Sequence, residues 1–271
     1  MNGTHVAGQG RATSPLDNVR VVLVEPASPG NIGATARVLR NTGISQLVLV
    51  NPPAPWCTEE ARWLAHGSQE ILESCQVAPD LAGAVADAHL VVGTTHRLGR
   101  FREVETDLKQ VAAEVASLAF HHRVALVFGR EKDGLWREEL LHCDRLLRFP
   151  TAVSYPSLNL SHAVLLLAYE VFAAVQQAPA RPSRPGDLVT AAEREQLVGH
   201  LLQALETIGF RGRNADPANF ARVLRRVLNR IPLARRDLRV IHRVCGQVDK
   251  FAARRAPQAA LGEPATPHSQ R

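Results

Sequence analysis

The first stretch of this 271-residue chain with residues suited to chemistry runs from Val21 to Arg37. An apolar run there leads into a glycine-containing turn and then a helical stretch that carries Asn31 and Arg37. Backbone N–H groups at such a helix start can hold phosphate. The stretch matches neither G-x-G-x-x-G nor G-x-x-x-x-G-K-[ST], however. Spacing alone therefore favours a helix-capping Asn31 and a surface Arg37.

A second polar stretch, from Ala125 to Leu135, follows another apolar run. The run ends at Gly129, a group of charged residues that includes Glu131 comes next, and Gly134 closes the loop. Ligands of open parallel α/β sheets bind beyond the carboxyl ends of the strands. The two glycines that bracket Glu131 favour a functional loop over an ordinary polar one.

The third stretch, from Phe149 to Val164, is rich in hydroxyl and amide groups. Ser157 or Asn159 is suited to cap the apolar helix that follows. Ser161 and His162 suggest a nucleophile and its base, but adjacent residues on a helix point apart. The chain also has no G-x-S-x-G elbow. A hydrolase is therefore not expected, and His162 is predicted to be a packing or interface residue.

These stretches sit within a pattern in which short β-branched runs alternate with helical segments. This pattern predicts a parallel α/β sheet over residues 18–177. The expected strands are 19–24, 46–51, 89–92 and 123–128, with weaker candidates at 143–149 and around Val77. Helices are expected at about 31–41 and 159–175.

The chain changes character at residues 178–187, where closely spaced prolines and a glycine predict a linker. Apolar residues then recur at helical spacing, which predicts a small helical domain over 188–255. Residues 1–17 and 256–271 are predicted to be disordered tails. The N-terminus lacks an apolar core of the signal-peptide type, no membrane span is expected, and four scattered cysteines suit a cytoplasmic protein.

Charge is divided unevenly along the chain. Residues 181–271 carry 17 Arg and Lys against 8 Asp and Glu, whereas residues 1–180 carry 15 against 18. A basic C-terminal third joined to a slightly acidic remainder predicts a polyanionic partner such as RNA. The chain has only three lysines, however, so its many arginines also fit a biased base composition of the coding sequence. Two sets of three arginines, each spaced every four residues, form either RNA-binding stripes or solvated helix faces: Arg222, Arg226 and Arg230, and Arg235, Arg239 and Arg243.

The ordered sequences N-I-G-A-x-x-R, F-G-R-E-x-x-G-L and S-L-N-L-S-H-A-V resemble the three signature motifs of the SpoU (TrmH-type, or SPOUT) RNA 2′-O-ribose methyltransferases. The resemblance covers about residues 19–175. Residues 199–210 and the basic helices after them resemble the helical extension of the TrmJ group. The resemblance implies a parallel-sheet domain with a C-terminal trefoil knot, a homodimer, and methylation of cytidine or uridine at position 32 of the tRNA anticodon loop.

The resemblance also implies roles for individual residues. Arg37 matches the family's catalytic arginine, and Asn31, Glu131, Ser157 and Asn159 complete the catalytic group, with Glu131 expected to orient Arg37. S-adenosyl-L-methionine is expected to lie bent among the knot loops, and no metal is implied. The residues expected to bind this cofactor are Thr94, Thr95, His96, Gly129, Phe149, Pro156, Ser157 and Leu158.

Two other functions stay open from the sequence. One is a related 2′-O-methyltransferase that acts on another RNA, such as ribosomal RNA. The other is a noncatalytic RNA-binding protein with the same knotted fold, against which the intact catalytic set counts.

Overall fold

The computed structural model describes residues 14–96, 104–153, 158–178, 186–210 and 217–255. Its centre is a six-stranded, entirely parallel sheet in the order β3-β2-β1-β5-β4-β6. The strands are β1 (Val19–Val24), β2 (Gln46–Val50), β3 (Gln76–Ala78), β4 (Leu90–Thr94), β5 (Val124–Phe128) and β6 (Arg145–Leu147). The predicted parallel α/β class is therefore confirmed.

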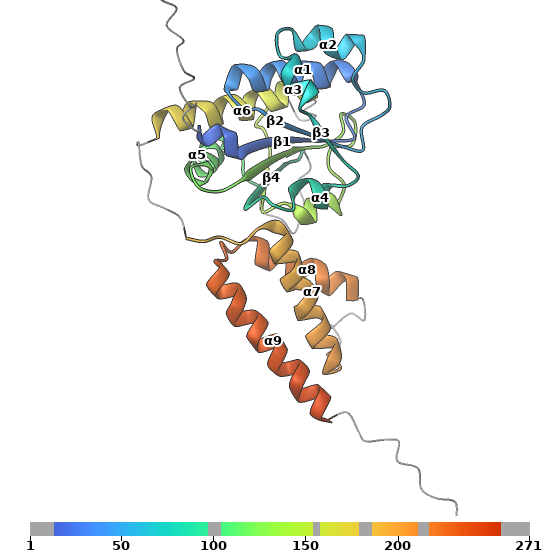
Figure 1. The fold of residues 1–271 in the computed structure, drawn as a ribbon, viewed down its shortest axis with the longest axis vertical. Helices are drawn as coiled ribbons and strands as arrows, with labels where there is room; N and C mark the ends of the chain where they lie inside the picture. Colours follow the sequence, from blue (N-terminus) through green and yellow to red (C-terminus); the bar gives the residue numbers. More distant parts are fainter. Residues whose placement is uncertain (1–13, 97–103, 154–157, 179–185, 211–216, 256–271) are drawn as a thin grey trace, which may run out of the picture.

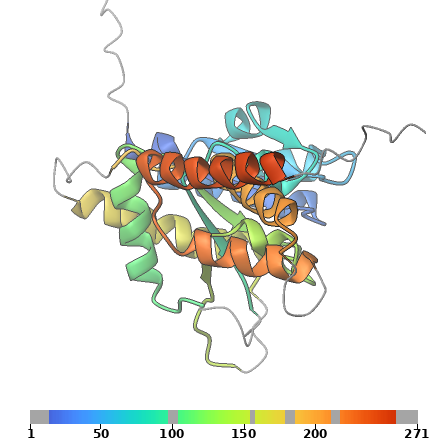
Figure 2. The same cartoon turned by 90° about the horizontal axis from the view of Figure 1, so that it is seen from below.

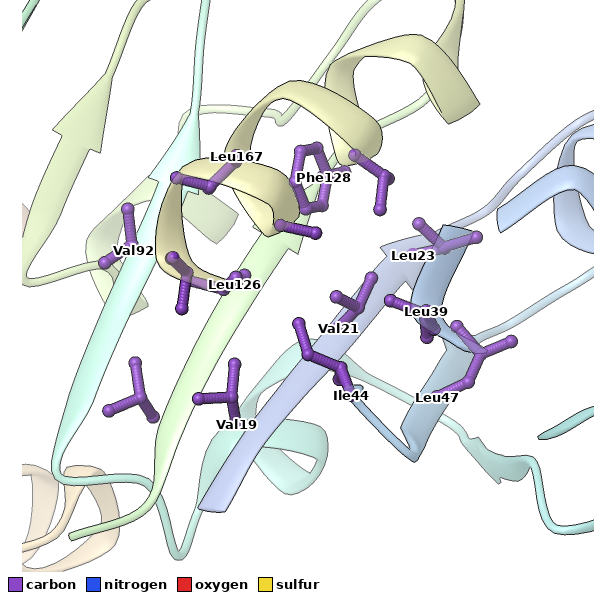
Figure 3. Close-up of a cluster of buried hydrophobic side chains, with 14 of the residues drawn as sticks. Val19, Val21, Leu23, Leu39, Ile44, Leu47, Val92, Leu126, Phe128 and Leu167 are labelled. Carbon is purple, nitrogen blue, oxygen red and sulfur yellow. The ribbon is translucent and has the colours of Figure 1, made fainter. Parts of the chain in front are cut away.

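The two central strands, β1 and β5, are adjacent and almost wholly apolar. Val19 pairs with Val124 and Leu23 with Phe128, so both strands reach the same carboxyl edge. All five residues of β5 are buried, as expected for a parallel strand covered on both faces. Figure 3 shows side chains from β1, β4 and β5 meeting those of the covering helices in one cluster.

Helices cover both faces of the sheet (Figure 1). On one face lie α1 (Pro29–Thr42), α5 (Leu108–Ala119) and α6 (Leu160–Gln177), with the short η1 (Pro15–Asn18) beside α5. Beyond α1 lie α2 (Glu59–Ala65) and α3 (Gln69–Glu73). The opposite face carries α4 (Leu81–Val85) and η2 (Glu139–His142).

Helix α6 is long and apolar enough, by length and composition, to cross a membrane. In the structure it packs between α1 and α5. Val164, Leu167 and Val171 are fully buried there and belong to the main hydrophobic cluster. The apolar residues on the inner side of α6 are thus explained by their contacts with the core.

Three helices follow the proline-rich segment: α7 (Ala191–Thr207), α8 (Pro217–Asn229) and α9 (Arg235–Arg255). A Thr190 capping box starts α7, and the chain leaves it through Gly209, whose φ is +74°. Helix α7 packs against both α8 and α9 around a small cluster that includes Val189, Leu197 and Leu228. The three helices lie below the sheet in Figure 1 and in front of it in Figure 2.

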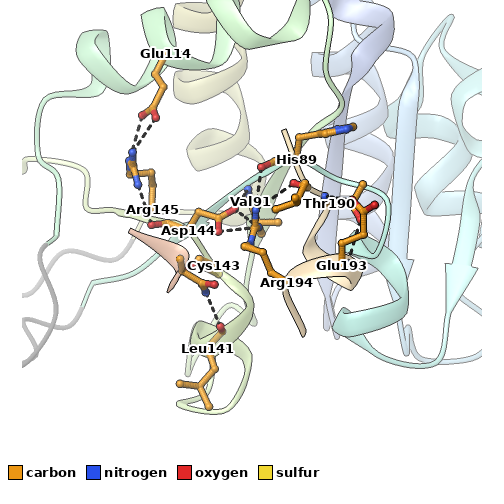
Figure 4. A network of polar contacts seen from close by, with 12 residues as sticks. His89, Val91, Glu114, Leu141, Cys143, Asp144, Arg145, Thr190, Glu193 and Arg194 are labelled. Atoms are coloured by element: carbon orange, nitrogen blue, oxygen red, sulfur yellow. Dashed lines mark hydrogen bonds and ion pairs between the residues drawn. The ribbon is translucent and has the colours of Figure 1, made fainter. Parts of the chain in front are cut away.

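A buried ion pair joins α7 to the sheet (Figure 4). Arg194 Nη2 lies 2.8 Å from each carboxylate oxygen of Asp144, and the two side chains are only 8% and 4% exposed. Asp144 also accepts a hydrogen bond from the Val91 N–H, at 2.8 Å. Burial raises the pKa of Asp144 to about 6, although Arg194 and the Val91 N–H act in the opposite direction. The helices are therefore anchored on the sheet by a charge pair as well as by apolar contacts.

Candidate active site

The candidate site lies at the carboxyl edge of the sheet, where the loops after β1 and β5 and the start of α6 converge. The loop after β1 leads into α1, which carries Asn31, and the loop after β5 carries Glu131. Asn159 is the N-cap residue of α6. Because β1 and β5 are hydrogen-bonded neighbours, the first two loops lie next to each other.

One chain of hydrogen bonds joins the three motifs. Asn31 Nδ2 donates to Glu131 Oε1 at 2.8 Å. Asn159 Nδ2 in turn donates to Asn31 Oδ1, also at 2.8 Å. The side-chain amide of Asn31 thus links two residues that lie 100 and 128 positions further along the sequence. We refer to Glu131, Asn31 and Asn159 as the polar chain.

Glu131 also holds the start of α1. Its carboxylate accepts hydrogen bonds from the N–H groups of Ala27, at 2.9 Å, and Ser28, at 3.3 Å. Burial alone would raise the pKa of Glu131, but these N–H groups and the Asn31 amide hold it below its ordinary value. An ionised carboxylate at a helix N-terminus also matches the helix dipole. Glu131 is therefore a charged anchor that fixes where Asn31 stands.

Asn159 both caps α6 and reaches the site. Its Oδ1 accepts from Ser161 N at 2.9 Å and from Ser161 Oγ at 2.7 Å. The expected capping role is therefore present alongside the contact with Asn31. Ser161 is buried and its hydroxyl is used by the cap, whereas His162 is exposed. This geometry agrees with the prediction that Ser161 and His162 are not a catalytic pair.

Arg37 lies further along α1, and its side chain is exposed. Within the described part of the chain it makes no hydrogen bond or ion pair. The Glu131 carboxylate is held by the start of α1, and no hydrogen bond from Arg37 reaches it within the described residues. That Glu131 orients Arg37 therefore stays a prediction. A guanidinium left unpaired is available to bind an anion.

The residues expected to hold the cofactor come largely from the ends of β4, β5 and β6. Thr94 Oγ1 donates to Val127 O at 3.2 Å, and Thr95 N donates to Leu147 O at 2.9 Å. Phe149 is half-buried and packs against the main core, whereas Leu158 is 39% exposed. The exposed His96 ring lies near Gly134. Pro156 and Ser157 lie outside the described residues.

The structure also gives Gly129 a role within its own loop. A Cβ at this position would lie 2.1 Å from the Gly134 carbonyl carbon and 2.3 Å from Leu135 N. Arg130 and Gly134 exchange backbone hydrogen bonds, which folds the loop back onto Gly129. The loop itself therefore approaches Gly129 closely enough to require glycine at this position.

Arg130, for which the sequence pattern predicts no role, organises the same loop. Arg130 Nε donates to Glu25 at 2.7 Å, and its two terminal nitrogens donate to Glu139 at 3.0 and 2.9 Å. These contacts raise the pKa of Arg130 against the effect of burial. The only available signal was its place beside Glu131 in the F-G-R-E motif.

The six predicted RNA-binding arginines differ in their surroundings. Arg222 and Arg226 on α8 are half-buried, and Arg222 donates to Asn219 Oδ1 at 3.3 Å. Arg235 forms ion pairs with Asp187 and Glu193, each at 3.2 Å. Arg230, Arg239 and Arg243 are exposed. The two stripes are thus unequal, and the α9 stripe offers the more accessible positive charge.

Comparison with known proteins identifies the family. The model of the SpoU rRNA Methylase family matches residues 18–169. A tRNA (cytidine/uridine/adenosine-2′-O-)-methyltransferase TrmJ of Pseudomonas aeruginosa is 35% identical over 249 residues, which covers 88% of this chain and 96% of that protein. A tRNA (cytidine/uridine-2′-O-)-methyltransferase TrmJ of Yersinia enterocolitica is 36% identical, covering 87% and 93%.

A solved structure agrees with these relatives. The crystal structure of TrmJ from Z. mobilis ZM4 superposes with a TM-score of 0.73 at 28% identity, covering 85% of this chain and 98% of that one. The similarity thus extends beyond the family model into the C-terminal helices. The chain therefore belongs to the SpoU family of RNA 2′-O-methyltransferases, and within that family it is of the TrmJ type.

Proposed function

We propose that the chain is an S-adenosyl-L-methionine-dependent tRNA 2′-O-methyltransferase that modifies cytidine or uridine at position 32 of the anticodon loop. The observation that carries the proposal is the polar chain, because it joins all three motifs at one sheet edge. The substrate class is supported by the TrmJ relatives, which are named as tRNA methyltransferases and match nearly the whole chain.

The residues at the neighbouring strand ends suit this cofactor. Thr94 ends β4 and Thr95 follows it, Gly129 follows β5, and Phe149 follows β6. Because β4 lies between β5 and β6, these three ends are adjacent. They offer backbone groups, hydroxyls and one aromatic ring, which suit an adenosyl group without a charged partner. S-adenosyl-L-methionine, when bound, supplies the methyl group, and we propose that no metal is needed.

Arg37 acts, in this proposal, as a cationic clamp at the substrate ribose. A guanidinium is effectively always protonated, so it is unsuited to remove the 2′-hydroxyl proton. Its exposed and unpaired state within the described chain leaves it available for a phosphate and for negative charge that develops on the 2′-oxygen. Asn31, held at both ends of its amide, orients the ribose, and Ser157 and Asn159 complete the pocket.

The working form is proposed to be a cytoplasmic homodimer in which the C-terminal portion of the sheet domain forms a trefoil knot. The outer side of α6 supports the dimer, since Leu165, Leu166 and Tyr169 are 42%, 43% and 57% exposed. An exposed apolar row of this kind is typical of a protein–protein interface. The helices of residues 188–255 are proposed to form the RNA-binding domain, with 178–187 as its linker.

The position is tested with two tRNA transcripts that differ at one atom. One carries cytidine at position 32 and the other carries 2′-deoxycytidine there. Methyl transfer is measured with labelled S-adenosyl-L-methionine in the presence of EDTA, with a ribosomal RNA fragment as a third substrate. We expect transfer to the first transcript only.

Each other outcome overturns a specific part of the proposal. Equal transfer to both transcripts would move the target away from position 32. Transfer to the ribosomal fragment alone would favour the ribosomal RNA enzyme. Cofactor-independent RNA binding with no transfer to any substrate would favour the noncatalytic protein, and activity only with a divalent ion would contradict the metal-free reaction.

A further inference from the structure

A large exposed aromatic side chain, Trp136, lies in the same loop system as the candidate site. It is 49% exposed and stands five residues after Glu131, in the segment between β5 and η2. The Arg130 guanidinium carbon lies 3.5 Å from the centre of the Trp136 ring. One ring face is thus in contact with a cation, although about half of the residue is open to solvent.

The support beneath the ring is rigid. The Arg130 side chain is 10% exposed and is held by ion pairs to Glu25 and Glu139. The Trp136 N–H donates to Glu139 Oε2 at 2.6 Å, so the same carboxylate holds both the tryptophan backbone and the arginine. A ring fixed in this way loses little conformational freedom when a second planar group stacks on it.

The loop that carries Trp136 also connects the candidate site to the C-terminal helices. Leu140 N in η2 donates to Trp136 O at 3.0 Å. Asn229 at the end of α8 donates to Leu141 O, also in η2, at 3.0 Å. An RNA that reached from the basic helices to the candidate site would therefore pass close to Trp136.

We propose that Trp136 is a stacking platform for a nucleobase of the RNA substrate, outside the nucleotide that is methylated. This inference rests on the proposed function and adds a positioning residue to it. Every base has a planar π-face, so stacking would hold the loop without selecting a sequence. The Arg130–Trp136 pair then extends into a stack of guanidinium, indole and base.

The test uses the full-length protein and compares three variants with the wild type. Trp136→Leu removes the planar ring, Trp136→Phe keeps one, and Trp63→Leu removes a different exposed tryptophan, 77% exposed on α2. Affinity for tRNA and for S-adenosyl-L-methionine is measured separately by titration. Trp136→Leu should bind tRNA about 5- to 150-fold more weakly, the range expected for one stacked base.

The same experiment separates stacking from a structural role. We expect Trp136→Phe to restore most of the tRNA affinity, and we expect Trp63→Leu and all cofactor affinities to match the wild type. Unchanged tRNA binding by Trp136→Leu would overturn the inference while leaving the proposed function intact. An equal loss of cofactor affinity, or a changed association state, would assign the ring to local structure or to a protein interface instead. Failure of the wild type itself to bind tRNA would overturn the proposed function.

Discussion

Glu131 shows how one carboxylate sets the geometry of the site. It accepts two backbone N–H groups before α1 and the amide of Asn31. The motif alone marked this residue as functional but implied a different partner, Arg37. Sequence could not predict the partners seen in the structure, because adjacent Arg130 and Glu131 are both charged and only the folded loop directs them to different groups.

The depressed pKa of Glu131 leads to a prediction with a definite sign. Its contribution to stability is present above the ordinary glutamate pKa and is lost as pH falls through the lowered value of the folded state. Glu131→Gln should therefore cost about 1 kcal/mol at neutral pH, because a charged hydrogen-bond network is replaced by a neutral one. Urea unfolding should show the difference from wild type shrinking near pH about 3. An equal difference at both pH values would contradict this role.

Gly129 offers a steric prediction at the same scale. Gly129→Ala should lower the free energy of unfolding by about 1–3 kcal/mol, because the new methyl group meets the 134–135 backbone. Gly199→Ala in α7 is a matched control, since nothing lies within 4 Å of its added Cβ. That control should be stabilised by about 0.5–1 kcal/mol. Thermal unfolding of both variants measures the contrast, and similar changes would argue against the crowded loop.

At the scale of elements, the apolar runs predicted most of the sheet. The four stronger candidates correspond to β1, β2, β4 and β5, which are the inner strands. The weaker candidates became β3 and β6, the two edges, with three residues each. Edge strands carry a weaker signal because only one neighbour pairs with them and, as at Val77, side chains can stay exposed.

The contact between α7 and the sheet could not be predicted from periodicity. Arg194 lies in the first turns of an amphipathic helix, where a charged residue ordinarily faces solvent. Its partner Asp144 stands just before a short edge strand. Nothing in the spacing of residues 50 positions apart indicates that both side chains are buried together.

This ion pair gives the prediction at the scale of elements. Arg194→Met should lower the free energy of unfolding by about 3–5 kcal/mol at neutral pH, because it leaves the buried Asp144 carboxyl without its cationic partner. The loss should shrink at about pH 5, since the folded-state pKa of Asp144 is already raised and the carboxyl then takes up a proton.

Two further variants test the cause of that loss. Adding Asp144→Asn to Arg194→Met should recover part of the stability, because no buried charge remains. Arg225→Met, which breaks the more exposed pair with Glu195, should cost less than about 1 kcal/mol. The stabilities are compared by urea unfolding midpoints at neutral pH and at about pH 5. A wild-type midpoint for Arg194→Met would show that the ion pair contributes nothing to stability.

At the scale of the whole molecule, the sequence showed how charge and helices are distributed along the chain, but it did not show which arginine side chains are exposed. The basic last third was evident from counting, yet Arg222 and Arg226 are half-buried and Arg235 is paired with carboxylates. Arg239 and Arg243 lie on the exposed face of α9, and which face is exposed is decided by how α9 packs on α7.

Salt dependence of tRNA binding tests the proposed role of α9. Replacing Arg239 and Arg243 together with Gln should lower the log–log salt slope by about 1.4–1.8, because each neutralised phosphate contributes about 0.7–0.9. Arg123→Gln is the matched control, since that arginine is already paired with Asp87. Equal slopes for wild type and the double variant would show that this face is only solvated.

The most direct test of the central claim is methyl transfer to ribose by the intact protein. Purified wild type and Arg37→Ala are incubated with tRNA and S-adenosyl-L-methionine, and the digested nucleosides are analysed by mass spectrometry. We expect 2′-O-methylated cytidine or uridine with the wild type and a rate about 10²–10³-fold lower with Arg37→Ala, at nearly unchanged cofactor affinity. Absence of 2′-O-methylated nucleosides with the wild type, or a wild-type rate for Arg37→Ala, would contradict the account.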